Sequence, residues 1–418
     1  MSNVVPEGWE VKRLDEYCYR VTDGTHDSPK RTNEGVRLVT SKNLKRGKLD
    51  FSSAYLISHT DFAEIEKRSK VDAGDVLFGM IGTIGNPVIV KDLSTPFAIK
   101  NVALFKFNGD LTKARWLQFY LDSSDFKLYV ERSQTGNAQS FLGLGFLRET
   151  LLPVPPLPEQ KKIASILTSV DEVIENTQKQ IDKLQDLKKA TMNELLTKGI
   201  GHTEFKDSEL GRIPKSWEVQ SLLEVATNGI SNGVFNDPKK QGGDYRLINV
   251  YDMYQGFGVD IQKLSRLELS EKEFLNNRVE YGDIFLTRSS LKLEGIAHCN
   301  ICLNDSENLT YDGHLMKITP NKSLVEPIYL ALQCLSDAGR LFLMRMAKQS
   351  TMTTIGQQDI APLPIPLPSL EEQRQIIGIH ESFEVRLKRL KTKVSQTQSL
   401  KKSLMQDLLT GKVRVTVN

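Results

Sequence analysis

The chain has 418 residues, of which 39% are hydrophobic and 26% are charged, and its formal net charge is +3. This composition is typical of a folded protein with two or three domains, and it excludes a long disordered chain, which would be poorer in apolar residues. No run of about 18 apolar residues occurs, so we expect no membrane span. The first residues show no signal peptide. Four cysteines do not make a disulfide framework, so we expect a reduced, cytoplasmic protein.

Residues 1–155 are expected to form a first globular domain of mixed α/β type. Short apolar runs after Gly-Asp turns, such as the one that follows Gly74-Asp75, indicate strands, and a helix is expected over 114–129. The stretch from Ser28 to Lys48 holds seven basic residues and one acidic residue. Such a stretch is either a solvated loop or a surface for nucleic acid.

The end of this domain resembles a cofactor motif. Phe141-Leu142-Gly143-Leu144-Gly145 has the Phe-x-Gly-x-Gly pattern of adenine methyltransferases, but prolines follow over 153–158 and are expected to stop any regular element. The Asn/Asp-Pro-Pro-aromatic motif that would accompany it is missing, and no Gly-x-x-x-x-Gly-Lys-Ser/Thr loop occurs. The sequence therefore predicts a chain that is not an enzyme, with no catalytic residue and no cofactor of its own.

Residues 156–200 are expected to form a long helix, because 159–198 contain neither Gly nor Pro. Of ten positions spaced four and three apart, seven are apolar, which is the heptad pattern of a coiled coil. These seven interface positions are Ile163, Leu167, Val170, Ile174, Ile181, Leu184 and Leu195.

The rest of the chain repeats what precedes it, with residues 201–366 as a second globular domain and 367–418 as a second long helix. Trp9 returns as Trp217 at an offset of 208, whereas Glu159-Gln160 returns as Glu372-Gln373 at an offset of 213. The second copy has therefore gained about five residues, and a period this long indicates a duplicated domain. The second helix carries its apolar positions at Ile376, Phe383, Leu387, Leu390, Val394, Leu404 and Leu408, and Lys188 and Lys401 hold equivalent core-type positions.

The equal length of the two helices suggests that they pair with each other. The connection between them is a whole domain, so its length does not decide between a parallel and an antiparallel pair, but an antiparallel pair would relate the two copies by a pseudo-twofold axis, and we favour it. Two similar domains on a rigid rod could read two half-sites on DNA, because protein symmetry mirrors half-site spacing. The alternative is a structural scaffold whose two domains bind other proteins.

A Cys-x-x-Cys pair at Cys299 and Cys302 raises the question of a metal site. A structural zinc needs four ligands, usually from two such pairs, and only Cys334 and His314 could complete the set. We predict buried strand cysteines and no metal.

The order of the parts resembles one family closely. A globular domain, Pro-Leu-Pro-x-x-Glu-Gln leading into a long helix, a second globular domain and a Pro-x-Pro leading into a second helix is similar to the specificity subunits of type I restriction–modification enzymes. Pro-Glu-Gly-Trp-Glu at 6–10, Ile-Pro-Lys-Ser-Trp-Glu at 213–218 and the Asp-Gly-Thr-His loop at 23–26 agree with this family. The second copy departs from it, because Asn232-Gly233-Val234-Phe235 replaces the Asp-Gly-x-His loop.

The resemblance implies a fold, a function and partners. It implies two α/β target-recognition domains, separated by helices in an antiparallel coiled coil, that read the two halves of a bipartite asymmetric site in double-stranded DNA. It implies that the coiled coil docks two modification (methyltransferase) subunits and that restriction subunits, which are ATP-dependent translocases and endonucleases, join them. S-adenosylmethionine, Mg²⁺ and ATP would then belong to those partners. The alternatives are a coiled-coil scaffold and a stand-alone DNA-binding protein without such partners.

Candidate DNA contacts are polar, basic or aromatic loop residues, because loops on a rigid scaffold usually carry recognition. Basic side chains suit phosphates and guanine, and amides suit adenine. For each residue, a solvent-facing side chain without a role is an equal alternative; His26 could simply cap its turn, and Phe235 could belong to the core. The candidates are Thr25, His26, Lys30, Arg31, Lys42, Asn43, Asn137 and Gln139 in the first domain, and Asn232, Phe235, Asn236, Lys239, Lys240, Lys348, Gln349 and Thr351 in the second.

Overall fold

The computed structural model describes residues 5–45, 47–133, 141–305 and 307–417. It divides the chain into two compact units, of which unit 1 is Met1–Lys179 with Leu390–Asn418 and unit 2 is Gln180–Arg389. The two long helices, α6 (Leu157–Lys198) and α11 (Leu370–Leu409), each contribute one part to each unit. Unit 1 therefore contains the start of α6 and the end of α11, and unit 2 contains the end of α6 and the start of α11.

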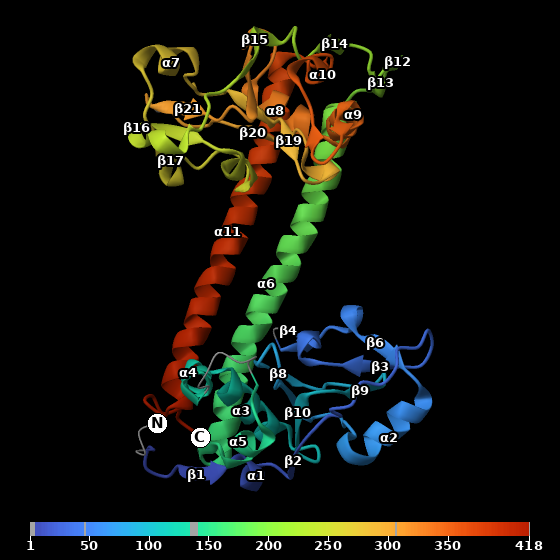
Figure 1. The fold of residues 1–418 in the computed structure, drawn as a ribbon, viewed down its shortest axis with the longest axis vertical. Helices are drawn as coiled ribbons and strands as arrows, with labels where there is room; N and C mark the ends of the chain where they lie inside the picture. Colours follow the sequence, from blue (N-terminus) through green and yellow to red (C-terminus); the bar gives the residue numbers. More distant parts are fainter. Residues whose placement is uncertain (1–4, 46, 134–140, 306, 418) are drawn as a thin grey trace. The chain divides into compact units, whose positions relative to one another are not determined.

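The remaining regular elements of unit 1 follow one another in the first part of the chain (Figure 1). The strands are β1 (Glu10–Arg13), β2 (Arg20–Asp23), β3 (Val36–Val39), β4 (Leu44–Lys45), β5 (Lys48–Leu49), β6 (Tyr55–Ile57), β7 (Val76–Gly79), β8 (Gly85–Ile89), β9 (Phe97–Ile99), β10 (Val102–Lys106) and β11 (Leu151–Val154). The helices are α1 (Leu14–Tyr17), α2 (His59–Ser69), α3 (Leu111–Asp122), α4 (Ser124–Ser133), α5 (Leu144–Glu149) and the 3₁₀ turns η1 (Ser41–Asn43) and η2 (Phe51–Ser53).

Unit 2 has a similar succession of elements. Its strands are β12 (Phe205–Ser208), β13 (Gly211–Pro214), β14 (Glu218–Ser221), β15 (Ala226–Asn232), β16 (Gln241–Ile248), β17 (Ser265–Leu267), β18 (Ile284–Thr287), β19 (Ser289–Ser290), β20 (Cys299–Ile301), β21 (Leu309–Tyr311), β22 (Leu315–Pro320), β23 (Lys348–Gln349), β24 (Thr353–Thr354) and β25 (Pro364–Leu367). Its helices are α7 (Glu271–Asn276), α8 (Pro327–Leu335), α9 (Asp337–Met346), α10 (Gln357–Ile360) and the 3₁₀ turns η3 (Pro238–Lys240), η4 (Val250–Tyr254), η5 (Ile261–Lys263) and η6 (Leu293–Gly295).

The central sheet has the same order in both units. It runs β2-β10-β7-β8 in unit 1 and β15-β22-β18-β20 in unit 2, and all its pairings are antiparallel. A three-stranded sheet also recurs, as β6-β3-β9 and as β17-β16-β21, each with one parallel pairing. Both units are therefore mixed α/β domains of one topology, in agreement with the expected duplication.

The strands that follow the Gly-Asp turns are buried on both faces. In β7, Val76 and Phe78 belong to one hydrophobic cluster and Leu77 to another. In β18, Ile284 and Leu286 likewise belong to one cluster and Phe285 to another. Successive side chains of a strand point to opposite faces, so a continuous apolar run needs cover on both sides. This explains why these segments lack the polar alternation of a half-exposed strand.

The proline-rich segments are regular, contrary to expectation. Residues of β11 pair with β1, Val11 opposite Pro153, and β25 pairs with β14, Val219 opposite Pro366. Proline is tolerated here because each sheet has only two strands, and the proline lacks only a donor that an edge strand does not need. These strands lead directly into α6 and α11.

The long helices bury the positions that the heptad pattern selects. All fourteen of the predicted interface residues are buried or half-buried, and none of them is exposed. Several pack inside their own unit, for example Ile163 and Leu408 in the main cluster of unit 1 and Leu195 and Ile376 in that of unit 2. In the part of the chain that the structure describes, no helix is long and apolar enough to cross a membrane.

A glutamate marks the start of each long helix, and it is buried in unit 1 and half-buried in unit 2. In unit 1 the carboxylate of Glu159 accepts a hydrogen bond from Trp9 Nε1 at 3.1 Å and pairs with Arg414 at 2.8 and 2.9 Å. In unit 2 the carboxylate of Glu372 accepts from Trp217 Nε1 at 3.1 Å and faces His202 Nε2 at 2.8 Å. The tryptophan and Glu-Gln motifs of the sequence therefore meet in space in each copy.

The core-type lysines also pair with acidic groups of the other helix. In unit 1 Lys401 Nζ lies 2.7 Å from Asp171 Oδ1, and in unit 2 Lys188 forms an ion pair with Glu384. Lys188 and Lys401 are 213 residues apart, and so are Asp171 and Glu384. One ion pair has thus been duplicated along with the domain.

His380 should make unit 2 sensitive to acid. The ring is buried, with the ring of Phe257 at 4.8 Å between centroids, and burial together with nearby Lys188 lowers its pKa to about 4, while Glu384 opposes the shift. The unfolded state would bind a proton near pH 6.5, so stability falls as the pH drops from about 6.5 to about 4. Because of His380, the wild type should lose about 2 kcal/mol of folding stability between pH 7 and pH 5. The His380→Leu variant should not show this loss.

Denaturant unfolding of unit 2 at the two pH values measures this effect. His59→Leu is the matched control, because His59 is exposed. Equal pH dependence in wild type and His380→Leu would contradict the assignment.

Candidate DNA-reading edge

Several of the candidate residues that the structure describes lie where strands of the central sheet end. In unit 1 this place consists of the end of β2 at Asp23, the turn Lys100–Asn101 before β10, and the end of β7 at Gly79. In unit 2 it consists of the end of β15 at Asn232, the turn Asp312–His314 before β22, and the end of β18 at Thr287. We call each of these places the loop edge of its unit.

The loop after β2 is fixed to this edge by backbone hydrogen bonds. Thr25 N–H donates to the Ile99 carbonyl at 3.0 Å, and Asn101 N–H donates to the Thr25 carbonyl at 3.1 Å. In unit 2, Val234 N–H donates to the Tyr311 carbonyl at 2.9 Å and Gly313 N–H to the Val234 carbonyl at 2.7 Å. The bonds are equivalent, so His26 and Phe235 hold the same position, one residue beyond the clamped one.

A glycine allows this close approach in both units. A Cβ at Gly24 would lie 2.2 Å from the Ile99 carbonyl oxygen, and a Cβ at Gly233 would lie 2.0 Å from that of Tyr311. Only glycine fits where the backbone comes so near to another strand. The Asp-Gly-x-His loop and the sequence that replaces it in the second copy are therefore one structural element.

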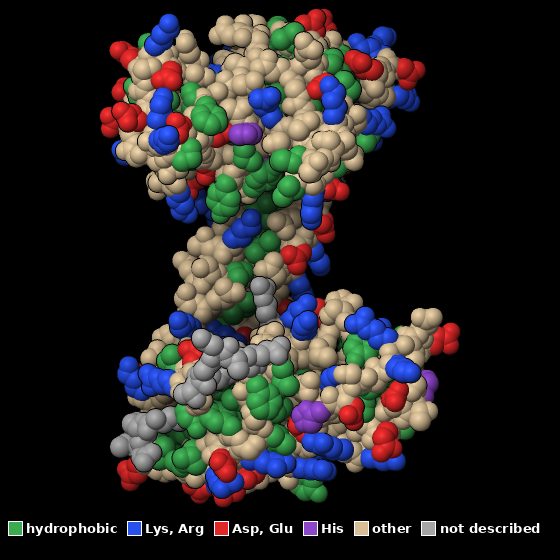
Figure 2. All heavy atoms as spheres, in the orientation of Figure 1, with side chains coloured by type: hydrophobic (Ala, Val, Ile, Leu, Met, Phe, Trp, Pro, Cys, Tyr) green, Lys and Arg blue, Asp and Glu red, His purple; other side chains and the backbone are tan. Residues whose placement is uncertain are grey.

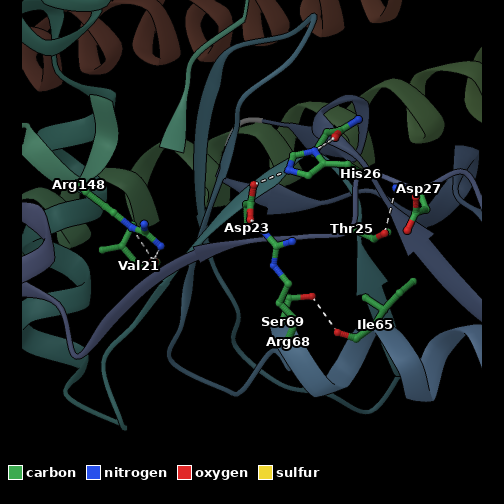
Figure 3. A network of polar contacts seen from close by, with 10 residues as sticks. Val21, Asp23, Thr25, His26, Asp27, Ile65, Arg68, Ser69 and Arg148 are labelled. Carbon is green, nitrogen blue, oxygen red and sulfur yellow. Dashed lines mark hydrogen bonds and ion pairs between the residues drawn. The ribbon is translucent and has the colours of Figure 1, made fainter. Parts of the chain in front are cut away.

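His26 is held from both sides in unit 1 (Figure 3). Its Nε2 lies 2.9 Å from Asp23 Oδ2, and its Nδ1 lies 2.9 Å from Asn101 Oδ1. The Asp23 carboxylate is buried and also pairs with Arg68 of α2. Both ring nitrogens are occupied, so His26 braces the loop against the turn before β10. This extends the reading of His26 as a cap, because the ring also contacts a distant segment.

The other candidates in unit 1 differ in accessibility. Lys30, Arg31 and Lys42 are exposed, whereas Asn43 is buried, with its amide group bonded to Thr40 N–H and to the Asp50 carbonyl, both at 2.9 Å. The turn η1 that holds Lys42 reaches the loop edge, because Ser41 Oγ donates to the Asn101 carbonyl at 3.4 Å. Asn137 and Gln139 lie outside the described residues.

In unit 2, Asn232, Phe235, Lys239, Lys348, Gln349 and Thr351 are exposed, and Asn236 and Lys240 are half-buried. Phe235 is 78% exposed, so its alternative reading as a core residue is wrong. Asn236 Nδ2 donates to Asn249 Oδ1 at 3.0 Å.

A second segment joins the loop edge of unit 2. Ile355 N–H donates to the Arg288 carbonyl at 3.0 Å, directly after β18, and β24 pairs with both β19 and β23. This small sheet holds Lys348 and Gln349. The edge thus collects candidates from segments more than 100 residues apart in the sequence.

Sequence reasoning missed Arg68 and Asn101, which hold the Asp23–His26 pair. Arg68 lies 45 residues from Asp23, and Asn101 lies 75 residues from His26. Neither belongs to a motif, and no local pattern could have found them.

The two units differ in charge. Unit 1 holds 30 Lys and Arg against 24 Asp and Glu, and unit 2 holds 25 against 28. On the face shown in Figure 2, basic and acidic side chains are interspersed. A phosphate-binding surface in unit 2 must therefore be local, since the unit as a whole is acidic.

The cysteines are all buried free thiols, and burial raises the pKa of Cys299 well above its usual value. Among the described residues, no group of three or more His, Cys, Asp and Glu side chains could hold a metal ion.

A family model described as type I restriction modification DNA specificity domain matches the chain twice, over residues 6–186 and 214–397. The specificity subunit of the type I restriction enzyme MjaVIII from Methanocaldococcus jannaschii is 28% identical over 423 residues, which cover 98% of this chain and 94% of that protein.

Two solved structures share the fold. A chain from a structure on complex assembly and conformational transition of the type I R-M system gives a TM-score of 0.61 at 16% identity, covering 98% of this chain and all 100% of that chain. The type I restriction–modification S subunit from M. genitalium gives 0.54 at 15% identity, covering 98% and 97%. At such identities the likeness shows the fold alone.

Gly24→Ala and Gly233→Ala should each loosen one loop edge. Each added methyl group would collide with a backbone carbonyl, which we expect to cost about 1–3 kcal/mol. Hydrogen–deuterium exchange should rise over 20–30 and 97–106 in the first variant and over 230–240 and 309–316 in the second.

Gly145→Ala and Gly378→Ala are matched controls, because a Cβ at either position meets nothing within 4 Å. If Gly24→Ala and Gly233→Ala show the same exchange as the wild type at their loop edges, the close backbone approach does not stabilise these loops.

Proposed function

This chain belongs to the family of type I restriction–modification specificity subunits, and we propose that each of its units reads one half of a bipartite, asymmetric site in double-stranded DNA. The observation that carries this proposal is the loop edge, which recurs with the same backbone hydrogen bonds and different side chains. Two loop edges with equivalent backbones and different side chains suit the recognition of two different half-sites. Those candidate residues that are exposed supply amide, basic and aromatic groups of the kinds that contact bases and phosphates.

The long helices are proposed to form an antiparallel coiled coil that sets the distance between the half-sites. The ion pairs support this direction within each unit. In unit 1, Glu159 pairs with Arg414 and Asp171 with Lys401; in unit 2, Lys188 pairs with Glu384 and Ile200 N–H bonds to Glu372. Residue numbers along α11 fall as those along α6 rise. With 42 residues, α6 is about 63 Å long at 1.5 Å per residue.

Two modification subunits are the proposed partners of this scaffold. The two units carry equivalent grooves, one of about 350 Å³ between α3 and the start of α6 and one of about 290 Å³ between α8 and the start of α11. Lys161 and Ala164 line the first groove, and Arg374 and Ile377, each 213 residues later, line the second. A groove that occurs twice suits one kind of partner bound twice.

Restriction subunits would join this assembly, and methyl transfer, ATP hydrolysis and DNA cleavage would then be catalysed by the partners. The chain itself is proposed to be non-catalytic and cytoplasmic, where DNA and these partners meet. A coiled-coil scaffold, or a DNA-binding protein without such partners, is the alternative; it predicts that the chain does not determine which adenines are methylated.

Sequencing-based mapping of adenine methylation tests the proposal. Cells that express the chain with its cognate modification subunit should methylate a split, asymmetric motif, which disappears when the chain is deleted. Replacing residues 1–155 by the corresponding domain of another family member should change one half-site and leave the other intact. Methylation that does not depend on the chain would favour the scaffold.

Charge reversal tests the helix pairing. Lys401→Glu places two acidic groups together and should lower the free energy of unfolding of unit 1 by about 1 kcal/mol, and Asp171→Lys in the same chain should restore most of it. Lys188→Glu with Glu384→Lys is the matched cycle in unit 2. If the free energy of unfolding of the double mutant is no higher than the sum of the two single effects predicts, the pairing is contradicted.

A further inference from the structure

The turn before the last strand of the central sheet differs between the two units. In unit 1 two residues, Lys100 and Asn101, connect β9 to β10; in unit 2 three residues, Asp312, Gly313 and His314, connect β21 to β22. The equivalent backbone bonds match Asn101 with Gly313, and the strand registers match Val102 with Leu315. The additional residue is therefore His314, and it lies at the loop edge.

The His314 ring is oriented by a buried carboxylate. Asp312 Oδ1 accepts a hydrogen bond from His314 N–H at 2.7 Å and lies 2.8 Å from His314 Nδ1. The side chain of Asp312 is 7% exposed and that of His314 is 66% exposed. A carboxylate on one ring nitrogen fixes the tautomer and the ring orientation, which leaves the other nitrogen available.

Arg288, directly after β18, fixes the same turn. Its guanidinium donates to the Gly313 carbonyl at 3.2 Å, and its N–H donates to the His314 carbonyl at 2.9 Å. Among the described residues, no hydrogen bond engages His314 Nε2. The ring is thus exposed, held in one orientation and free at one nitrogen.

The loop edge of unit 1 provides a contrast. There both nitrogens of His26 are occupied, by Asp23 and Asn101, so that ring is a brace. In unit 2 the position of His26 is held by Phe235, and that of Asn101 by Gly313, so the brace is gone. His314, which has a free ring nitrogen, lies next to Gly313, the residue that holds the position of Asn101.

We propose that His314 is a specificity-determining residue of unit 2, whose Nε2 hydrogen-bonds to a base edge in the half-site, with Asp312 as its positioning residue. The inference rests on the proposed DNA-reading function. At this turn the Asp312 carboxylate offsets the charge of the Arg288 guanidinium, which makes the turn a poor match for a phosphate. The Asp312 carboxylate on Nδ1 favours the tautomer in which Nε2 is an acceptor, which suits the amino group of adenine or cytosine in the major groove.

The test uses the complete chain with its modification subunit and compares wild type, His314→Ala and Asp312→Asn. Methylation mapping should show one position of the unit 2 half-site become degenerate in His314→Ala, with about a tenfold loss of discrimination there. Asp312→Asn should relax the same position less strongly. The unit 1 half-site should stay unchanged. His59→Ala, an exposed histidine in unit 1, is the matched control and should leave the whole motif unchanged.

Three results would overturn the inference. One is an unchanged motif in His314→Ala while the wild-type motif depends on this chain; the proposed function would then stand and this residue assignment would fail. Another is uniformly weaker DNA binding with a salt dependence reduced by about one counterion, which would make His314 a phosphate contact. If wild-type methylation does not depend on this chain at all, the proposed function fails first.

Should His314→Ala lower the melting temperature of unit 2, His314→Gln decides, because it keeps a polar side chain. A changed base preference at the same single position supports the inference, and an unchanged motif contradicts it.

Discussion

The paired carboxylate at the start of each long helix, which is largely removed from water, is the contact on which the rest of each unit depends. A charge removed from water is costly unless it is paired and hydrogen-bonded. Glu159 therefore requires both Trp9 and Arg414, and Glu372 requires Trp217 and His202. Each carboxylate ties three segments together: the residue just before the first strand of the sheet that the proline-rich segment joins, the start of the helix that leaves the domain, and the segment that follows the other long helix. These contacts fix the axial register of the two helix segments within each unit. The central sheet of the unit packs in the same core as these segments.

Such a frame lets the loop edges diverge. The tryptophan, the glutamate, the clamped loop and its glycine recur in both copies, whereas His26 becomes Phe235 and Asn101 becomes Gly313. Loops carried by a rigid sheet can exchange side chains at little cost in stability, because their backbone bonds are satisfied before any ligand arrives. The difference in net charge between the units points the same way, since it leaves unit 2 to rely on individual contacts rather than on a general attraction to DNA.

Much of this fold could be predicted from the sequence, because its strongest signals are periodic. The offsets of 208 and 213 identified the duplication, and the heptads identified α6 and α11. Local reasoning failed where distant segments decide. The prolines of β11 and β25 were expected to be irregular, but their partners β1 and β14 lie about 140 residues away and accept them as edge strands. Asn43 is a different case: its side-chain amide bonds locally, to Thr40 and Asp50, and its role as a DNA contact stays a prediction. The His26 brace could not be predicted locally, because Asn101 comes from the turn before β10, 75 residues away.

Aligning the strands of the two units locates the change of the repeat offset from 208 to 213. Gly79 and Thr287 hold equivalent places at the ends of β7 and β18, and β8 and β20 align by their pairing with those strands. Between them unit 1 has residues 80–84 and unit 2 has 288–296, which accounts for four of the five extra residues. The fifth is His314. The net gain of five residues therefore lies at the loop edge, whereas one residue that is gained between Trp217 and Asn232 is lost again before β18. A net gain concentrated at one edge of a duplicated sheet is expected if the frame is constrained by packing and the edge is where the copies perform different tasks.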